Sequence, residues 1–197
     1  MIVLENQIFP YSRSPLNTSF SDGKYMKNLS DRAARLVTGN PWTQQVHLGP
    51  LIDETQAKHF EESVNRSVAM GAKVVAGGKR DGNFFEATVL SGVTPEMPAF
   101  GEEIFGPVAP ITLFDSDEEA IALVNASPYG LAAAIHSAST ERAQRFAERI
   151  RVGMVHINDQ TVNNEFQVPF GGMGRSGTSG RFGGPANLDE FTTTQWG

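Results

Sequence analysis

Residues 108–158 alternate between apolar runs and amphipathic segments, and this rhythm restricts the fold more than any other feature of the sequence. The apolar runs predict buried strands at 108–114, 131–136 and 154–158. The segments between them, 117–125 and 140–150, carry apolar residues at helical spacing. A strand–helix–strand–helix–strand order is typical of right-handed βαβ crossovers. We therefore predict an α/β fold, a three-layer α/β/α sandwich around a mostly parallel sheet.

Upstream of this region the sequence predicts two helices and two short strands. Apolar residues recur at helical spacing over 24–37, and Gly39-Asn40-Pro41 ends that helix because proline cannot continue it. Asp53 is a candidate N-cap for a second helix, whose buried stripe is Phe60, Val64 and Val68. The predicted strands are 73–76 and 87–90.

Both ends of the chain have weaker signals. Residues 1–23 are rich in turn formers, and 159–182 form a long loop rich in Gly, Ser, Thr and Asn. A short helical turn at 187–191 and a last strand at 192–196 are expected. Neither a repeat nor an internal linker interrupts the chain, so one domain is predicted.

Composition excludes several classes of function. The 197 residues have a formal net charge of −6, which argues against nucleic acid or an anionic membrane as a partner. The chain has no cysteine, and its four histidines lack ligand spacing, so no metal site is predicted. No basic-then-apolar leader and no run of about 18 apolar residues occurs. We expect a cytoplasmic protein.

The segment Gly101–Val108, with the sequence GEEIFGPV, precedes the predicted strand 108–114. Ligands of open parallel sheets bind beyond the carboxyl ends of strands, so by itself this segment indicates only a turn. Together with four other segments, it resembles the aldehyde dehydrogenase family. Those segments, in family order, are Gly39–Pro41, Gly49–Asp53, Asn125–Leu131 and Pro169–Gly172.

The resemblance implies a role for several residues. Members of the family oxidise an aldehyde to an acid with NAD or NADP, through a cysteine thiolate. Glu103 matches the carboxylate that accepts hydrogen bonds from the nicotinamide ribose, and Phe105 matches an aromatic beside the nicotinamide ring. Gln56 matches a residue that reaches the same ribose region, although His59 stands where the family often has lysine. Phe170 matches an aromatic in the wall of the aldehyde tunnel.

Two further segments, His156–Val162 and Ser179–Gly184, look most like the benzaldehyde and vanillin dehydrogenase branch of the family. This likeness suggests an aromatic aldehyde as the substrate. The resemblance divides the chain into a divergent segment, 1–23, a catalytic-type domain, 24–182, and a C-terminal oligomerisation segment, 183–197. A homo-oligomer is expected.

The family's nucleophile is missing. At family spacing Phe9 occupies the cysteine position, and a phenyl group cannot form a thioester. Residues 10–22 do not resemble the family's strand at this place, which a truncated or frameshifted gene would explain. No dinucleotide-binding glycine motif follows a strand, and Gly171–Gly177 indicates a backbone turn rather than a phosphate loop.

Three interpretations follow. The chain is the C-terminal catalytic region of an aldehyde dehydrogenase, and by itself it is predicted to be inactive, with weak or no NAD binding. Alternatively, it is a non-catalytic assembly module whose last strand pairs with another chain. A third interpretation is a remnant that binds an aldehyde or nicotinamide weakly.

Overall fold

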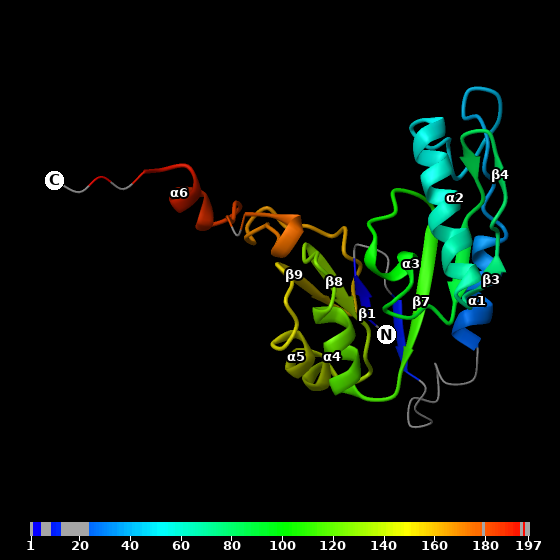
Figure 1. Ribbon diagram of the computed structural model, residues 1–197. Coiled ribbons are helices and arrows are strands. Elements are labelled where there is room, and N and C mark those ends of the chain that lie inside the picture. The colour runs from blue at the N-terminus through cyan, green and yellow to red at the C-terminus, as the bar shows by residue number, and fades with distance from the viewer. Residues whose placement is uncertain (1, 5–8, 13–23, 179, 194, 196–197) are drawn as a thin grey trace. The chain divides into compact units, whose positions relative to one another are not determined.

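The computed structural model describes residues 2–4, 9–12, 24–178, 180–193 and 195 (Figure 1). For strands 2–4 and 9–12 only the backbone is described. The chain forms two compact units, Asn6–Glu119 and a second that joins Met1–Glu5 to Ala120–Gly197. We call them the 6–119 unit and the 120–197 unit, and each is described by itself.

The 6–119 unit contains a four-stranded sheet in the order β2-β7-β6-β3. Its strands are β2 (Phe9–Ser12), β7 (Val108–Phe114), β6 (Thr88–Ser91) and β3 (Lys73–Ala76). β7 runs parallel to β2 and β6, whereas β3 pairs with β6 in the antiparallel direction. The helices are α1 (Lys24–Ala33), α2 (Glu54–Ala69) and the single turn α3 (Pro98–Gly101). A small hairpin joins β4 (Arg80–Asp81) to β5 (Phe84–Phe85).

Both faces of the sheet are buried at its central strands, β6 and β7. On one face Ala33 of α1 packs in a cluster with Val89 and Ile111, which lie on adjacent central strands. On the other face Leu90 and Pro110 are fully buried. Strands covered on both faces must be apolar throughout, which explains the near-continuous apolar run of β7.

The 120–197 unit contains a three-stranded sheet in the order β1-β8-β9. Its strands are β1 (Ile2–Leu4), β8 (Ala132–Ile135) and β9 (Met154–Ile157), with β8 parallel to β9 and antiparallel to β1. Helix α4 (Asp117–Asn125) leads into the unit, and α5 (Thr140–Ala147) connects β8 to β9. The 3-10 turn η1 (Gly174–Ser176) and helix α6 (Ala186–Glu190) follow along the chain.

The prediction of an α/β fold is confirmed, and several elements have the predicted bounds. β3, β7 and α4 match the sequence ranges residue for residue. The predicted capping box is also present: the Glu119 N–H donates to the Ser116 hydroxyl over 3.1 Å. The Glu119 carboxylate accepts in return from the Asp115 N–H, over 2.6 Å.

The sheets are small and mixed rather than one mostly parallel sheet. Of the four strands β2, β7, β6 and β3, the last is antiparallel to its neighbour. The residues between β3 and β6 form the β4–β5 hairpin instead of a crossover helix. Because a short connection returns the chain alongside the strand it leaves, it favours antiparallel pairing.

Three further expectations are corrected. The helix predicted over 24–37 ends at Ala33, and the Val37 N–H, which a continued helix would bond to the Ala33 carbonyl, donates instead to the His47 Nδ1 atom over 3.0 Å. Residues 1–23, expected to be irregular, contain β1 and β2. Val68, predicted to be buried, is 38% exposed.

The last strand expected at 192–196 is not formed at the described positions Thr192, Thr193 and Gln195. The remaining two positions of that segment lie outside the described residues. Across the part of the chain that the structure describes, no helix combines the length and apolar character that a membrane span requires.

Candidate cofactor and substrate sites

The loop that carries Glu103 is fixed to helix α2 by its neighbour Glu102. The Glu102 carboxylate accepts a hydrogen bond from the Ser63 hydroxyl on α2. Its other oxygen pairs with the Arg66 guanidinium, one turn along the same helix, at 3.3 Å. Charge-assisted bonds to two helix side chains fix the position of the loop backbone at Glu102.

Two more contacts extend this attachment in both directions. The Ala99 N–H of α3 donates to the buried Ser67 hydroxyl over 2.9 Å. At the far end of the loop Gly106 lies against the ring of Phe60, so closely that a Cβ at Gly106 would overlap ring carbons Cδ2 and Cε2. The segment from Ala99 to Gly106 therefore runs antiparallel along one face of α2.

Alternate residues of the loop have opposite roles. Glu102, Ile104 and Gly106 hold the loop in place, and Ile104 is only 1% exposed. Between them, Phe105 is 66% exposed and Glu103 is half-buried. Among the described residues, no hydrogen bond or ion pair engages the Glu103 carboxylate. The loop thus holds a carboxylate and an aromatic ring in a fixed backbone while leaving both available to a ligand.

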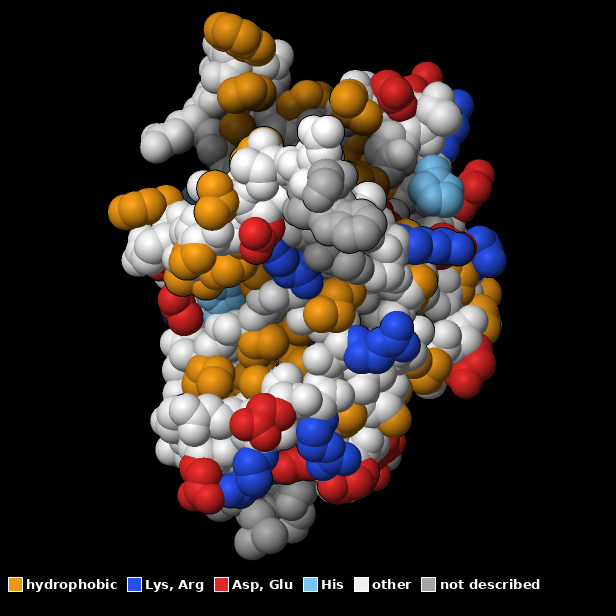
Figure 2. Space-filling model, turned by 90° about the vertical axis from the view of Figure 1, so that its left-hand side faces the viewer, with side chains coloured by type: hydrophobic (Ala, Val, Ile, Leu, Met, Phe, Trp, Pro, Cys, Tyr) orange, Lys and Arg blue, Asp and Glu red, His pale blue; other side chains and the backbone are white. Residues whose placement is uncertain are grey.

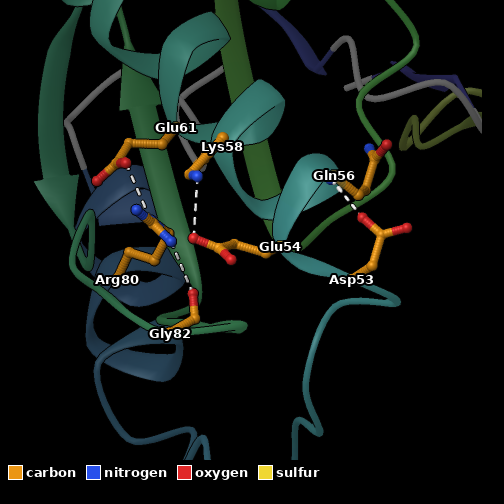
Figure 3. A network of polar contacts seen from close by, with 7 residues as sticks. All are labelled: Asp53, Glu54, Gln56, Lys58, Glu61, Arg80 and Gly82. Atoms are coloured by element: carbon orange, nitrogen blue, oxygen red, sulfur yellow. Dashed lines mark hydrogen bonds and ion pairs between the residues drawn. The ribbon is translucent and has the colours of Figure 1, made fainter.

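Gln56 lies in the first turn of α2. Its backbone N–H donates to the carboxylate of the N-cap Asp53 over 2.7 Å, as Figure 3 shows. The half-buried Gln56 side chain precedes Phe60 by four residues, so it lies on the helix face that meets the loop. His59, which replaces the family lysine, is exposed.

The other side of α2 carries a separate polar network (Figure 3). Lys58 pairs with Glu54 at 2.9 Å, and Glu61 accepts from the Arg80 Nε at 2.9 Å. Arg80 also donates to the Gly82 carbonyl over 2.9 Å, within the β4–β5 hairpin. The Arg80–Glu61 pair ties the hairpin to α2 and leaves the Gln56 side of the helix to the loop.

The remaining two predicted residues lie elsewhere. Phe9 begins β2 and pairs with Ile111, and of its side chain nothing is described. Phe170 belongs to the 120–197 unit, apart from the unit that contains Gln56, Glu103 and Phe105. Its backbone pairs with Phe182, whose N–H donates to the Phe170 carbonyl over 3.0 Å, and the ring centroids are 5.1 Å apart.

Phe170 lines a hollow of about 590 Å³. The hollow is formed by β9 and by the loop that follows it, and its other lining residues are Gly153–His156, Asp159, Val162–Glu165, Val168 and Pro169. This volume falls within the range of about 300–1,000 Å³ that is usual for small-molecule sites.

Two carboxylates line this hollow. Hydrogen bonds from the Asn163 amide, at 2.7 Å, and the Gln160 N–H, at 2.8 Å, hold the pKa of Asp159 below its usual range. Glu165 adds a second carboxylate, and no Lys or Arg is among the described lining residues. The hollow is therefore unfavourable for an anionic ligand.

Sequence reasoning missed His156. The sequence does not single it out, because the histidines of this chain show no ligand spacing. In the structure its Nε2 atom is buried and, within the described part of the chain, has no hydrogen-bond partner. The alternation of side chains along a predicted strand could have marked it as facing the same way as Met154, but not as unpartnered.

Comparison with known proteins places these residues in context. The family described as "Aldehyde dehydrogenase family" matches residues 12–196. Benzaldehyde dehydrogenase [NAD(+)] of Pseudomonas putida is 54% identical over 173 residues, which cover 88% of this chain and 36% of that protein. A vanillin dehydrogenase of an Amycolatopsis species is 49% identical over 174 residues, which cover 88% of this chain and 36% of that protein.

Solved structures agree. The crystal structure of a salicylaldehyde dehydrogenase from Pseudomonas putida G7, complexed with salicylaldehyde, superposes with a TM-score of 0.85 at 32% identity. The match covers 95% of this chain and 38% of that one. This chain thus spans somewhat more than a third of the length of the proteins it resembles.

The contact between Gly106 and Phe60 yields a prediction about stability. Gly106→Ala should lower the free energy of unfolding by about 1–3 kcal/mol, because the fully buried Phe60 ring, stacked edge-on against Phe85, has no room to move. Urea unfolding measures the effect.

Gly101→Ala is the matched control, because a Cβ at Gly101 meets no atom within 4 Å. Its free energy of unfolding should stay within about 0.5 kcal/mol of the original. Equal stabilities of the two variants would contradict the described loop position.

Proposed function

The chain belongs to the aldehyde dehydrogenase family, and on that basis we propose that it is the C-terminal catalytic region of an NAD- or NADP-dependent enzyme that oxidises an aldehyde to the carboxylic acid. The observation that carries the proposal is the alternation in the loop, which fixes Glu102, Ile104 and Gly106 and leaves Glu103 and Phe105 available. For the complete catalytic domain we propose a three-layer α/β/α sandwich around a mostly parallel sheet.

The residues present suit a nicotinamide cofactor. An ionised carboxylate only accepts hydrogen bonds, so Glu103 can receive two donors such as the hydroxyls of a ribose. The exposed Phe105 ring can limit the position of a flat group beside it, and the side-chain amide of Gln56 can donate and accept hydrogen bonds. When bound, NAD or NADP supplies the hydride acceptor of the oxidation.

The hollow at Phe170 supports an aromatic aldehyde as the substrate. Valine and phenylalanine side chains suit an uncharged ring, and the carboxylates of Asp159 and Glu165 repel a substrate that carries a carboxylate of its own. The relatives include benzaldehyde and vanillin dehydrogenases as well as succinate-semialdehyde dehydrogenases. Because the described lining of the hollow contains neither Lys nor Arg, we favour the aromatic substrates of the first two.

The chain itself should be inactive. It has no cysteine, and Phe9, at the family's nucleophile position, cannot attack a carbonyl. The dinucleotide domain of the family corresponds to no part of these residues, so NAD should bind weakly or not at all. We propose the catalytic-type region as 24–182, a divergent segment as 1–23, and a cytoplasmic location.

Activity measurements test the proposal. The purified chain should produce no NADH from benzaldehyde and NAD. A chimera in which residues 24–197 replace the matching C-terminal part of Pseudomonas putida benzaldehyde dehydrogenase should be active, because its N-terminal part supplies the region that carries the family's cysteine.

The complete Pseudomonas putida enzyme is the positive control. NADH production by the isolated chain at the rate of that enzyme would refute the inactivity. A folded chimera with no activity above background would refute the assignment of this region to the catalytic domain.

A second function, assembly with other copies, is favoured by exposed apolar side chains near the C-terminus. Phe166 is 90% exposed, Leu188 71% and Phe191 77%. Leu188 and Phe191 are three residues apart and lie on one side of the last helical turn. Figure 2 shows many hydrophobic side chains at the surface of the face that it presents. We propose that residues 183–197 contribute to a homo-oligomer.

Light scattering tests this second function. The chain should self-associate at tens of micromolar, and Leu188→Ser with Phe191→Ser should shift it toward monomer by removing apolar contacts. Trp42→Ser with Ile52→Ser is the matched control, since both residues are exposed in the 6–119 unit. A strict monomer, or equal shifts in the two variants, would contradict the proposal.

A further inference from the structure

Asn158 directly follows β9 and has an unusual backbone conformation. Its φ angle is 58°, and among the described residues no other residue except glycine has a positive φ. Asparagine tolerates this left-handed conformation better than most residues, because its short amide can form hydrogen bonds with nearby backbone. Here the Asn158 Oδ1 atom accepts from the Ser137 N–H over 2.8 Å, and its Nδ2 atom donates to the Ser137 carbonyl over 3.0 Å. We call this pair of bonds the Asn158 clamp.

The Asn158 clamp extends the pairing of two parallel strands beyond their carboxyl ends. Ile135 and Ile157 are the last paired residues of β8 and β9. The Asn158 N–H still donates to the Ile135 carbonyl over 2.8 Å, and the side-chain amide then bonds both backbone groups of Ser137. The clamp therefore fixes the direction in which the chain leaves β9.

The loop that begins after Asn158 returns to the opposite end of the same strand. Gly153, directly before β9, lies so close to the backbone of Gly171 that a Cβ at Gly153 would overlap the Gly171 carbonyl oxygen. Residues 159–170 thus span the length of β9 and are held at both of its ends. The hollow at Phe170 is lined by this loop and by β9, so its shape depends on where the loop lies.

We propose that Asn158 is a positioning residue for the substrate, because its clamp holds the loop 159–170 in the conformation that forms the hollow. The proposal rests on the proposed function and deepens it, since it names a residue that sets the shape of the proposed aldehyde site. Asn158 is not among the described lining residues of the hollow, so it acts through the loop that begins at Asp159.

The strength of hydrogen bonds sets the size of the expected effect. One hydrogen bond in a folded protein favours the conformation that contains it by about two- to tenfold. A ligand that binds only the conformation with a formed hollow loses apparent affinity in proportion as that conformation becomes less populated. Loss of the Asn158 clamp should therefore weaken binding in the hollow without removing any group that lines it.

Binding of an unreactive ring compound to the full chain tests the inference. Benzamide retains the ring and the carbonyl carbon of benzaldehyde but does not form imines with lysines. Its Kd is measured from chemical-shift changes in ¹H–¹⁵N spectra of the original chain and two variants. Asn158→Gly permits the positive φ but lacks the clamp, and Asn158→Asp keeps the acceptor and loses the donor.

Asn125→Ala is the matched control, because Asn125 makes an equivalent pair of bonds in the same unit. Its Nδ2 atom donates to the Arg149 carbonyl over 3.0 Å, and its Oδ1 atom accepts from the Arg151 N–H over 2.7 Å. Asn125 is not among the described lining residues of the hollow. Asn158→Gly and Asn125→Ala should both lower the urea midpoint of unfolding, but only Asn158→Gly should weaken binding.

Benzamide should shift resonances of residues 153–170 in the original chain. We expect Asn158→Gly to raise the Kd of benzamide about tenfold, because two hydrogen bonds are lost. Asn158→Asp, which retains one of them, should raise it about threefold. The Kd should be unchanged in Asn125→Ala.

An unchanged Kd in Asn158→Gly would overturn the positioning role, because the loop would then form the hollow without the clamp. An equal rise in Asn125→Ala would also overturn it, because lost stability alone would then explain the weaker binding. If the original chain does not bind benzamide, the inference fails, whereas the family activity is judged separately by the chimera. Should Asn158→Gly not fold, Asn158→Asp decides, and a Kd equal to that of the original chain would refute the inference.

Discussion

The ring of Phe60 lies against the backbone of Gly106, and the position of the candidate cofactor loop depends on that contact. Phe60 is fully buried on α2 and meets Phe85 edge-on with ring centroids 4.3 Å apart. Only a residue without a side chain can approach it as Gly106 does. With the Glu102 carboxylate held by Ser63 and Arg66, the loop is fixed at both ends. Glu103 and Phe105, which lie between these ends, take no part in the contacts with α2, and Phe105 is exposed.

Helix α2 positions the loop because its two sides have different partners. One side carries Arg80 and the hairpin through Glu61, and the other carries Phe60, Ser63 and Ser67 against the loop. Both serines are buried, which would be costly without partners. The Ser63 hydroxyl donates to the Glu102 carboxylate. The Ser67 hydroxyl accepts from the Ala99 N–H and donates to the Ser63 carbonyl. Buried hydroxyls therefore set the register of the loop along the helix, whereas Phe60 and Ile104 supply the apolar contact.

Some elements could be predicted from the sequence because local chemistry determines them. β7 is a near-continuous apolar run, and α4 begins with its own capping box, so both have the predicted bounds. The end of α1 could not be predicted, because it depends on pairing between Val37 and His47, ten residues away. In the stripe predicted to be buried on α2, Phe60 and Val64 are buried and only Val68 is not. The burial of Ser63 and Ser67 could not be predicted, because their partners Glu102 and Ala99 lie more than 30 residues away. That the buried His156 Nε2 atom has no hydrogen-bond partner among the described residues likewise could not be predicted, because it depends on the folded structure.

Ser63 and Arg66 of α2 fix the loop through Glu102, and we propose that the neighbouring Glu103 thereby holds a ribose. The most direct measurement is the KM for NAD in the chimera, compared between Glu103→Gln and its neighbour Glu102→Gln. Glu103→Gln should raise that KM by about tenfold with unchanged stability, because one acceptor of ribose hydroxyls becomes an uncharged amide. Glu102→Gln should instead lower the free energy of unfolding by about 1 kcal/mol and change the KM less, because its bonds are to α2. A larger KM effect at Glu102 than at Glu103 would contradict the account.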